Sequence, residues 1–227
     1  KQAMASGVIP QITAVFGQCG GGLAVASAMT DFTFVESKKG KMFLNSPNAI
    51  EGNEVSKCDT SSAKFQGEEA GMIDLAATED EILEEIRALV CMLPANNEDD
   101  ASYDECLDDL NRLCEGIELG AEDAVLLAET ISDENIFFET KKEYAKDMVT
   151  GFIRLNGMTV GVVANRSKVY DEDGNVAETY ETTLSAKGAK KAADFVEFCD
   201  AFSIPLVTFT NELSLSTLKR LVVELTE

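Results

Sequence analysis

The chain has 227 residues and a net charge of -22, and most of that charge lies in one region. Between Glu68 and Asp147 we count 25 acidic and 5 basic residues, a balance of -20; the remaining residues hold 16 acidic and 14 basic ones, a balance of -2. Because an acidic surface repels phosphate groups, we expect no nucleic-acid partner and no binding to an anionic membrane. The acidic region is interpreted as a solvated helical surface, with a docking face for a basic partner as the alternative.

The absence of histidine excludes Ser-His-Asp triads, Cys-His dyads and His-ligated zinc within these residues. The six cysteines form no C-x-x-C pair, so we expect no bound metal and the reduced thiols of a cytoplasmic protein. No apolar run approaches the ~20 residues of a membrane span, which argues against membrane insertion. The chain begins inside an apolar pattern without Met, so we expect a fragment without a signal peptide.

The first part of the chain alternates strand and helix patterns. The apolar, β-branched run Val8–Phe16 predicts a strand covered on both faces. Three glycines, Gly20 to Gly22, separate it from a predicted short helix over Leu23–Met29. The following runs predict two strands and a short helix opened by proline, at Asp31–Val35, Lys41–Leu44 and Pro47–Ile50.

The acidic middle predicts three helices. The clearest is Glu79–Leu93, where Thr78 and Glu81 form a capping box and apolar residues recur on one face. A second capping box at Ser102 and Glu105 predicts another helix to Ile117. Its apolar stripe is predicted at Leu107, Leu110, Cys114 and Ile117, with Cys106 and Cys114 facing the core. A third amphipathic stretch covers Glu122–Ile131.

After Asp147 the pattern changes to β. Phe152–Leu155 and Met158–Ala164 flank Asn156-Gly157, a pair that suits the positive φ angles of a type I′ hairpin turn. Asp173-Gly174 is a second turn signal. A helix capped by Ser185 is predicted over Ala186–Phe202, and a buried strand over Ile204–Phe209. Both ends of the chain therefore indicate an α/β fold with parallel strands.

Three long segments resemble one family in sequence and in order. They are GVIPQITAVFGQCGGGLAVASAMTDFTFV (Gly7–Val35), KKEYAKDMVTGFIRLNGMTVGVVAN (Lys141–Asn165) and FVEFCDAFSIPLVTFTN (Phe195–Asn211). Each resembles the biotin-dependent acyl-CoA carboxyltransferases, whose members include acetyl-, propionyl- and methylcrotonyl-CoA carboxylase subunits and methylmalonyl- and glutaconyl-CoA decarboxylase subunits. The final run, Glu212–Glu227, departs from the family and predicts an unrelated amphipathic helix.

The resemblance implies a crotonase-like superhelix of ββα units in two related lobes, both incomplete here. Residues 1–95 are then the C-terminal part of the N-lobe, on the acyl-CoA side. Residues 96–147 form an acidic helical linker. Residues 148–227 begin the C-lobe, on the biotin side.

The implied reaction moves a carboxyl group between an acyl-CoA thioester and biotin on a separate carrier protein or domain, through a thioester enolate. Two backbone N–H groups aimed at the enolate oxygen form an oxyanion hole, and glycines permit its close approach. Matching the family's C-x-G-G motif places these catalytic donors at Gly21 and Gly22. The alternative is a strand-to-helix turn that needs glycine only for packing. The spacing fits neither a dinucleotide fingerprint nor a P-loop.

Other residues carry weaker signals. Asp31 is expected to cap or orient its strand. Lys38, Lys39 and Lys41 are interpreted as a solvated loop, with contact to CoA phosphates as the alternative. The family needs no protein base, because the biotin nitrogen can exchange the proton.

We expect a homo-oligomeric carboxyltransferase subunit, with a non-catalytic crotonase-fold interaction subunit as the alternative. A hydratase is disfavoured because Gly17–Thr30, the stretch around the glycine turn, contains no carboxylate. The isolated chain is expected to be inactive, since no residues match the biotin-side oxyanion site of the second lobe. The acyl group, and the choice between carboxylase and decarboxylase, stay open.

Overall fold

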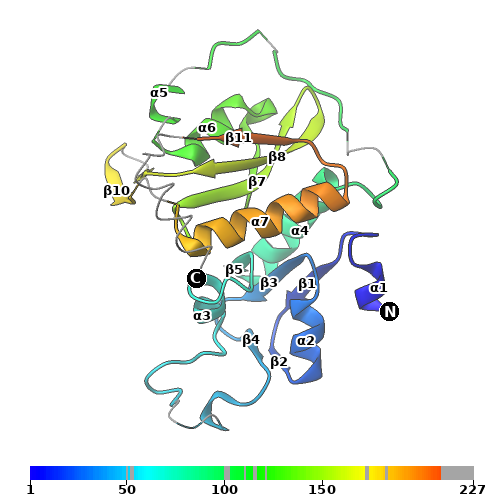
Figure 1. Cartoon of the computed structure of the whole chain (residues 1–227), viewed down its shortest axis with the longest axis vertical. Helices are drawn as coiled ribbons and strands as arrows, with labels where there is room; N and C mark the ends of the chain where they lie inside the picture. Colours follow the sequence, from blue (N-terminus) through cyan, green and yellow to red (C-terminus); the bar gives the residue numbers. More distant parts are fainter. Residues whose placement is uncertain are drawn as a thin grey trace, which may run out of the picture. The chain divides into compact units, whose positions relative to one another are not determined.

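The computed structural model describes residues 1–49, 51, 54–99, 103–109, 111–114, 117–120, 122–171, 174–181 and 184–210 (Figure 1). The chain divides into two compact α/β units. Unit 1 comprises Lys1–Ser102, Lys141–Tyr144 and Ala201–Ser203. Unit 2 comprises Tyr103–Thr140, Ala145–Asp200 and Ile204–Glu227.

Unit 1 is built on a three-stranded parallel sheet of order β1-β3-β5. Its strands are β1 (Ile12–Val15), β3 (Phe32–Glu36) and β5 (Leu75–Ala77). A separate parallel pair joins β2 (Gln18–Gly20) to β4 (Lys41–Phe43). The helices are α1 (Gln2–Ala5), α2 (Gly22–Ala28), η1 (Pro47–Ala49), α3 (Ala63–Glu68) and α4 (Glu79–Met92).

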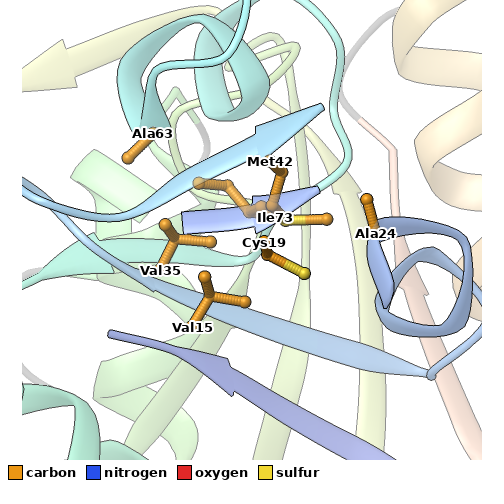
Figure 2. Packing of buried hydrophobic residues seen from close by; sticks show 7 residues of the cluster. All are labelled: Val15, Cys19, Ala24, Val35, Met42, Ala63 and Ile73. Atoms are coloured by element: carbon orange, nitrogen blue, oxygen red, sulfur yellow. The ribbon is translucent and has the colours of Figure 1, made fainter. Parts of the chain in front are cut away.

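The core of unit 1 gathers side chains from both sets of strands. Every residue of β3 is buried, as expected for a strand covered on both faces. One apolar cluster brings together residues of β1, β2, α2, β3, β4 and α3 with Ile73, which precedes β5. Figure 2 shows its members Val15, Cys19, Ala24, Val35, Met42, Ala63 and Ile73. The glycines after Cys19 are therefore held between two residues of this core, Cys19 and Ala24.

The capping box predicted for α4 is confirmed. The Thr78 hydroxyl accepts the Glu81 N–H at 3.4 Å, and the Glu81 carboxylate accepts the Thr78 N–H at 2.9 Å. That backbone donor holds the pKa of the Glu81 carboxyl below its ordinary value. The box satisfies N–H groups that a helix leaves without an intrahelical partner.

We predict that Thr78→Ala lowers the free energy of unfolding by about 0.5–2 kcal/mol, because the hydroxyl acceptor of the Glu81 N–H is lost. Urea unfolding followed by circular dichroism measures the change. Thr78→Ser keeps the hydroxyl and serves as the control. A Thr78→Ala variant as stable as Thr78→Ser would show that the cap contributes nothing.

Unit 2 is built on a four-stranded sheet of order β11-β8-β7-β6. The strands are β6 (Phe137–Thr140), β7 (Met148–Leu155), β8 (Met158–Asn165) and β11 (Leu206–Phe209). β11 runs parallel to β8, and the other pairs are antiparallel. A two-stranded ribbon joins β9 (Lys168–Tyr170) to β10 (Val176–Thr179). The helices are α5 (Ile117–Gly120), α6 (Ala124–Ile131), η2 (Asp133–Asn135) and α7 (Ala186–Ala201).

Helices α6 and α7 lie on opposite faces of the sheet of unit 2 (Figure 1). Successive side chains of β7 and β8 point to alternate faces and so pack against one helix or the other. Val149 and Ile153 join a buried cluster with Ala124 and Ala128 of α6. On the other face, the Phe152 ring lies 5.0 Å from that of Phe195 on α7. The sheet of unit 2 is thus covered on both faces.

Several predicted elements are confirmed in unit 2. The β7–β8 hairpin turns at Asn156 and Gly157 with φ angles of 52° and 79°, as the Asn-Gly pair indicates. Helices α6 and α7 occupy the predicted stretches, and the Ser185 hydroxyl accepts the Gly188 N–H at 2.9 Å. The predicted strand over Ile204–Phe209 corresponds to β11, but the prediction that it is buried is wrong: β11 is an edge strand, and its four residues are exposed or half-buried.

The helix predicted from Ser102 to Ile117 is wrong, because the described residues 103–109 and 111–114 are not helical. Acidic side chains there bond to nearby backbone instead: Asp104 accepts the Glu105 N–H and Asp109 accepts the Asn111 N–H, both at 2.9 Å. Such local bonds compete with the helix. Cys106 and Cys114 are half-buried rather than core residues.

The predicted strand Val8–Phe16 is shorter in the structure, where β1 covers Ile12–Val15, and only Val15 of β1 is buried, so the expected cover on both faces is not found. Strands β2 and β5 have no counterpart in the sequence-based prediction. The three-part division at 1–95, 96–147 and 148–227 stays a prediction, although the region assigned to a helical linker contains β6. Ser102, Asp173 and the helix predicted over Glu212–Glu227 lie outside the described residues. In the described part of the chain, no helix is long and apolar enough to cross a membrane.

Candidate functional site

The glycine turn joins the end of β2 to the start of α2. The pairing of β2 with β4 sets Gly20 opposite Phe43. Gly21 then precedes the first residue of α2 with φ 61° and ψ -132°, angles that residues with a Cβ adopt at a cost. The sequence therefore turns from strand into helix within two residues.

The two predicted donors differ in their availability. The Gly21 N–H donates to the Phe43 carbonyl at 2.9 Å. This bond belongs to the parallel pairing of Gly20 with Phe43, so the Gly21 N–H is not free for a ligand in this conformation. The assignment of Gly21 as a donor stays a prediction, and this hydrogen bond counts against it.

Gly22 keeps the properties that the sequence predicts. It is exposed, and a Cβ placed there would meet no atom within 4 Å. Its N–H belongs to the first turn of α2, where no intrahelical acceptor exists. Among the residues that the structure describes, no acceptor bonds to it. Its role as a donor, and a cleft in front of it, stay predictions.

The turn is anchored on both sides. Cys19 and Ala24 are 3% and 6% exposed and lie in the core cluster shown in Figure 2. The Ser27 hydroxyl donates to the Leu23 carbonyl at 3.1 Å and lies 3.4 Å from the Cys19 sulfur. These contacts fix the first turn of α2 against β2, which is the rigidity that a preorganised donor requires.

Other residues singled out in the sequence have structural partners. The Asp31 carboxylate accepts the Gln11 N–H at 2.7 Å and so joins the residue before β3 to the residue before β1, which agrees with an orienting role; burial raises the pKa of this carboxyl. Lys41 lies 2.9 Å from the Asp59 carboxylate. The side chain of Lys39 lies 3.5 Å from that of Glu79, and both are exposed. These contacts agree with a surface loop, and contact of the loop with CoA phosphates stays an untested alternative.

The described residues hold no cluster of three or more His, Cys, Asp or Glu side chains arranged to bind a metal ion. The expectation of a metal-free protein stays a prediction.

Sequence reasoning missed the part played by β4. Phe43 lies 22 positions after Gly21 and supplies both the carbonyl that takes its N–H and a ring against Gly20. No periodicity in the sequence indicates which strand pairs with β2, because a parallel partner is set by tertiary packing.

The carboxyl transferase domain family matches residues 1–212 of this chain. The chain belongs to this family. The resemblance found in the sequence is thereby confirmed.

Curated relatives agree with this membership. The propionyl-CoA carboxylase beta chain of Roseobacter denitrificans is 36% identical over 219 residues, covering 92% of this chain and 41% of that protein. The methylmalonyl-CoA decarboxylase subunit alpha of Veillonella parvula is 33% identical over 219 residues, covering 91% and 41%. The chain thus spans about two fifths of the length of these relatives.

Among solved structures, the chain is similar to transcarboxylase 12S, described as a hexamer assembly with hydrolyzed methylmalonyl-coenzyme A bound. The TM-score is 0.77 at 29% identity, over 98% of this chain and 44% of that one. The similarity places the α/β architecture of both units within the carboxyltransferase fold.

Proposed function

We propose that the protein containing this chain moves a carboxyl group between an acyl-CoA and biotin on a separate carrier. Membership of the carboxyl transferase family carries the proposal, and the anchored glycine turn with the exposed Gly22 at its helix start supports it. We also propose that units 1 and 2 belong to the two related lobes of a crotonase-like superhelix, on the acyl-CoA and biotin sides.

The proposed step breaks the bond between the carboxyl carbon and the α-carbon of the acyl group. The electron pair passes to the thioester as an enolate, and the released carboxyl carbon joins a biotin nitrogen. The proton that leaves this nitrogen is delivered to the α-carbon, so no protein base is consumed. A chain without histidine is consistent with this chemistry.

The Gly22 N–H is proposed as one donor to the enolate oxygen. Backbone donors fixed before the reaction stabilise developing charge without reorganising, and loss of one such donor typically costs about 2.7–4 kcal/mol of barrier reduction. The partial positive charge at the start of a helix acts in the same direction. Because the Gly21 N–H already donates to the Phe43 carbonyl, we propose that the second donor comes from another group.

For the substrate we propose the methylmalonyl-CoA and propionyl-CoA pair. Two relatives that match the chain, a propionyl-CoA carboxylase and a methylmalonyl-CoA decarboxylase, are named for these two thioesters. Partners are then the acyl-CoA, a biotin carrier protein or domain, and further copies of the chain. Transcarboxylase 12S is described as a hexamer assembly, which supports the homo-oligomer.

The test uses the protein that contains this chain, incubated with free biotin and methylmalonyl-, malonyl- or glutaconyl-CoA. Mass spectrometry measures carboxybiotin and the decarboxylated acyl-CoA. We expect both products in equal amounts, with methylmalonyl-CoA giving the highest kcat/KM. Carboxybiotin formation from none of the three, in a correctly assembled protein, would favour the non-catalytic interaction subunit.

A further inference from the structure

Strand β4 touches the glycine turn through a single residue, Phe43, in two different ways. Its carbonyl takes the Gly21 N–H at 2.9 Å, and its ring lies over Gly20. Neither contact belongs to α2, which provides the proposed donor. The two contacts are therefore independent means of fixing the turn from the neighbouring strand.

The backbone contact fixes the conformation of Gly21. With φ 61° and ψ -132°, this residue lies in a region that is accessible essentially to glycine alone. The bond to Phe43 fixes the peptide plane between Gly20 and Gly21. Together with the φ and ψ of Gly21, this plane sets the direction of the next one, which carries the Gly22 N–H.

The side-chain contact fixes Gly20. A Cβ built on Gly20 would lie 2.8 Å from Cε2 of the Phe43 ring, closer than real Cβ atoms approach a neighbour, and 3.1 Å from Cζ, a tight contact. The next ring atom, Cδ2, lies at 3.5 Å, an ordinary contact distance. The ring thus occupies the space that a side chain at Gly20 would need. Its strand is anchored by the neighbouring Met42, which is 4% exposed in the core.

From these two contacts we infer that Phe43 is the positioning residue of the glycine turn, which holds the Gly22 N–H in the direction that receives the thioester oxygen. Phe43 acts through Gly20 and Gly21 and touches no reacting atom. The inference rests on the proposed function, because the benefit of this positioning appears only in carboxyl transfer.

The test combines Gly20→Ala with Phe43→Leu. Leucine lacks the Cε2 and Cζ atoms that lie within 3.1 Å of the added methyl group, so the double variant removes the clash that Gly20→Ala creates. For Gly20→Ala alone we expect kcat to fall about 10²-fold, an effect that a misplacement of about 1 Å can produce. We expect KM for the acyl-CoA to change less than about threefold, because positioning acts on the transition state.

In the double variant, kcat should return to the level of Phe43→Leu alone. Gly17→Ala is the matched control, because a Cβ there would meet no atom within 4 Å. A double variant as slow as the product of the two single effects would overturn the inference, and so would a Gly20→Ala enzyme with unchanged kcat. If Gly20→Ala alone does not fold, the inference is still tested by whether the double variant recovers folding and turnover.

Amide hydrogen exchange separates this inference from the proposed function. The Gly21 amide should exchange slowly and the Gly22 amide fast, and Gly20→Ala should accelerate exchange at Gly21. This pattern in a protein that makes no carboxybiotin would show that the turn is held as described while the proposed function fails. Fast exchange at Gly21 in the unmodified protein would reject the inference directly.

Discussion

Replacing Gly22 with alanine is expected to lower the kcat of carboxyl transfer about 10²–10³-fold, an effect as large as the loss of one oxyanion donor. The N–H itself is kept, but the added methyl group would stand beside it and hinder the close approach of the thioester oxygen to which it is proposed to donate. It would meet no protein atom within 4 Å, so the fold has no reason to change. Stability should be equal or higher by about 0.4–1 kcal/mol, because alanine has less conformational freedom to lose on folding.

Lower activity with equal or higher stability would distinguish the two interpretations of the glycine turn, an oxyanion site or a turn that needs glycine only for packing. If Gly22 were needed only for packing, its replacement would lower the stability of the protein before its activity. A Cβ at Gly22 instead meets open space. The prediction is checked by kcat for carboxybiotin formation together with the thermal midpoint of unfolding. Full activity in Gly22→Ala would show that the thioester oxygen does not approach the Gly22 N–H closely enough for a methyl group to hinder it, which contradicts the proposed site.

Gly21→Ala is the informative comparison. Its φ of 61° strains any residue with a Cβ, so this variant should lose stability as well as activity. Gly17→Ala should change neither, since a Cβ at Gly17 also meets open space. Among these three variants, only Gly22→Ala is expected to lower activity without lowering stability.

The position of the turn could be predicted from the sequence, but its hydrogen bonds could not. The order of strand, glycines and helix is local, and the C-x-G-G motif and the small residues that follow indicate it. Which N–H stays free depends on the pairing of Gly20 with Phe43, two residues brought together by parallel strands. Parallel pairs join residues far apart in the chain and leave no periodic signal, which is why the sequence did not indicate the bond from Gly21 to Phe43.

The same distinction between local and distant contacts explains the other outcomes. The Thr78–Glu81 capping box and the Asn156-Gly157 turn are specified within four residues, and both are confirmed. The segment after Ser102 also has a capping pattern, but Asp side chains there compete for the backbone, and no helix forms at 103–109. Strand β5 has three residues, too few for an alternating pattern to be detected.

The largest stability effect is expected at the ion pair of Arg166 and Asp123 in unit 2. The pair is bidentate: Nε lies 2.8 Å from Oδ1, and Nη2 donates to Oδ2 at 2.9 Å. The side chains are 10% and 2% exposed, so water does not replace a lost partner. The same carboxylate also accepts the Val125 N–H at the start of α6 and the Tyr170 N–H of β9. One carboxylate thus joins the end of β8, β9 and α6.

We predict that Arg166→Met lowers the free energy of unfolding by about 3–5 kcal/mol, because it leaves a buried carboxylate without its cation. Adding Asp123→Asn removes that charge, keeps an oxygen for the Val125 N–H, and should recover part of the loss. Lys190→Met on α7 is the control: its pair with Asp194 is exposed, and the expected cost is below about 1 kcal/mol. Guanidinium unfolding measures all three variants. If Arg166→Met lowers the free energy of unfolding no more than Lys190→Met, the buried pair does not stabilise unit 2. The Asp123 carboxylate would then be solvated or neutralised without its arginine.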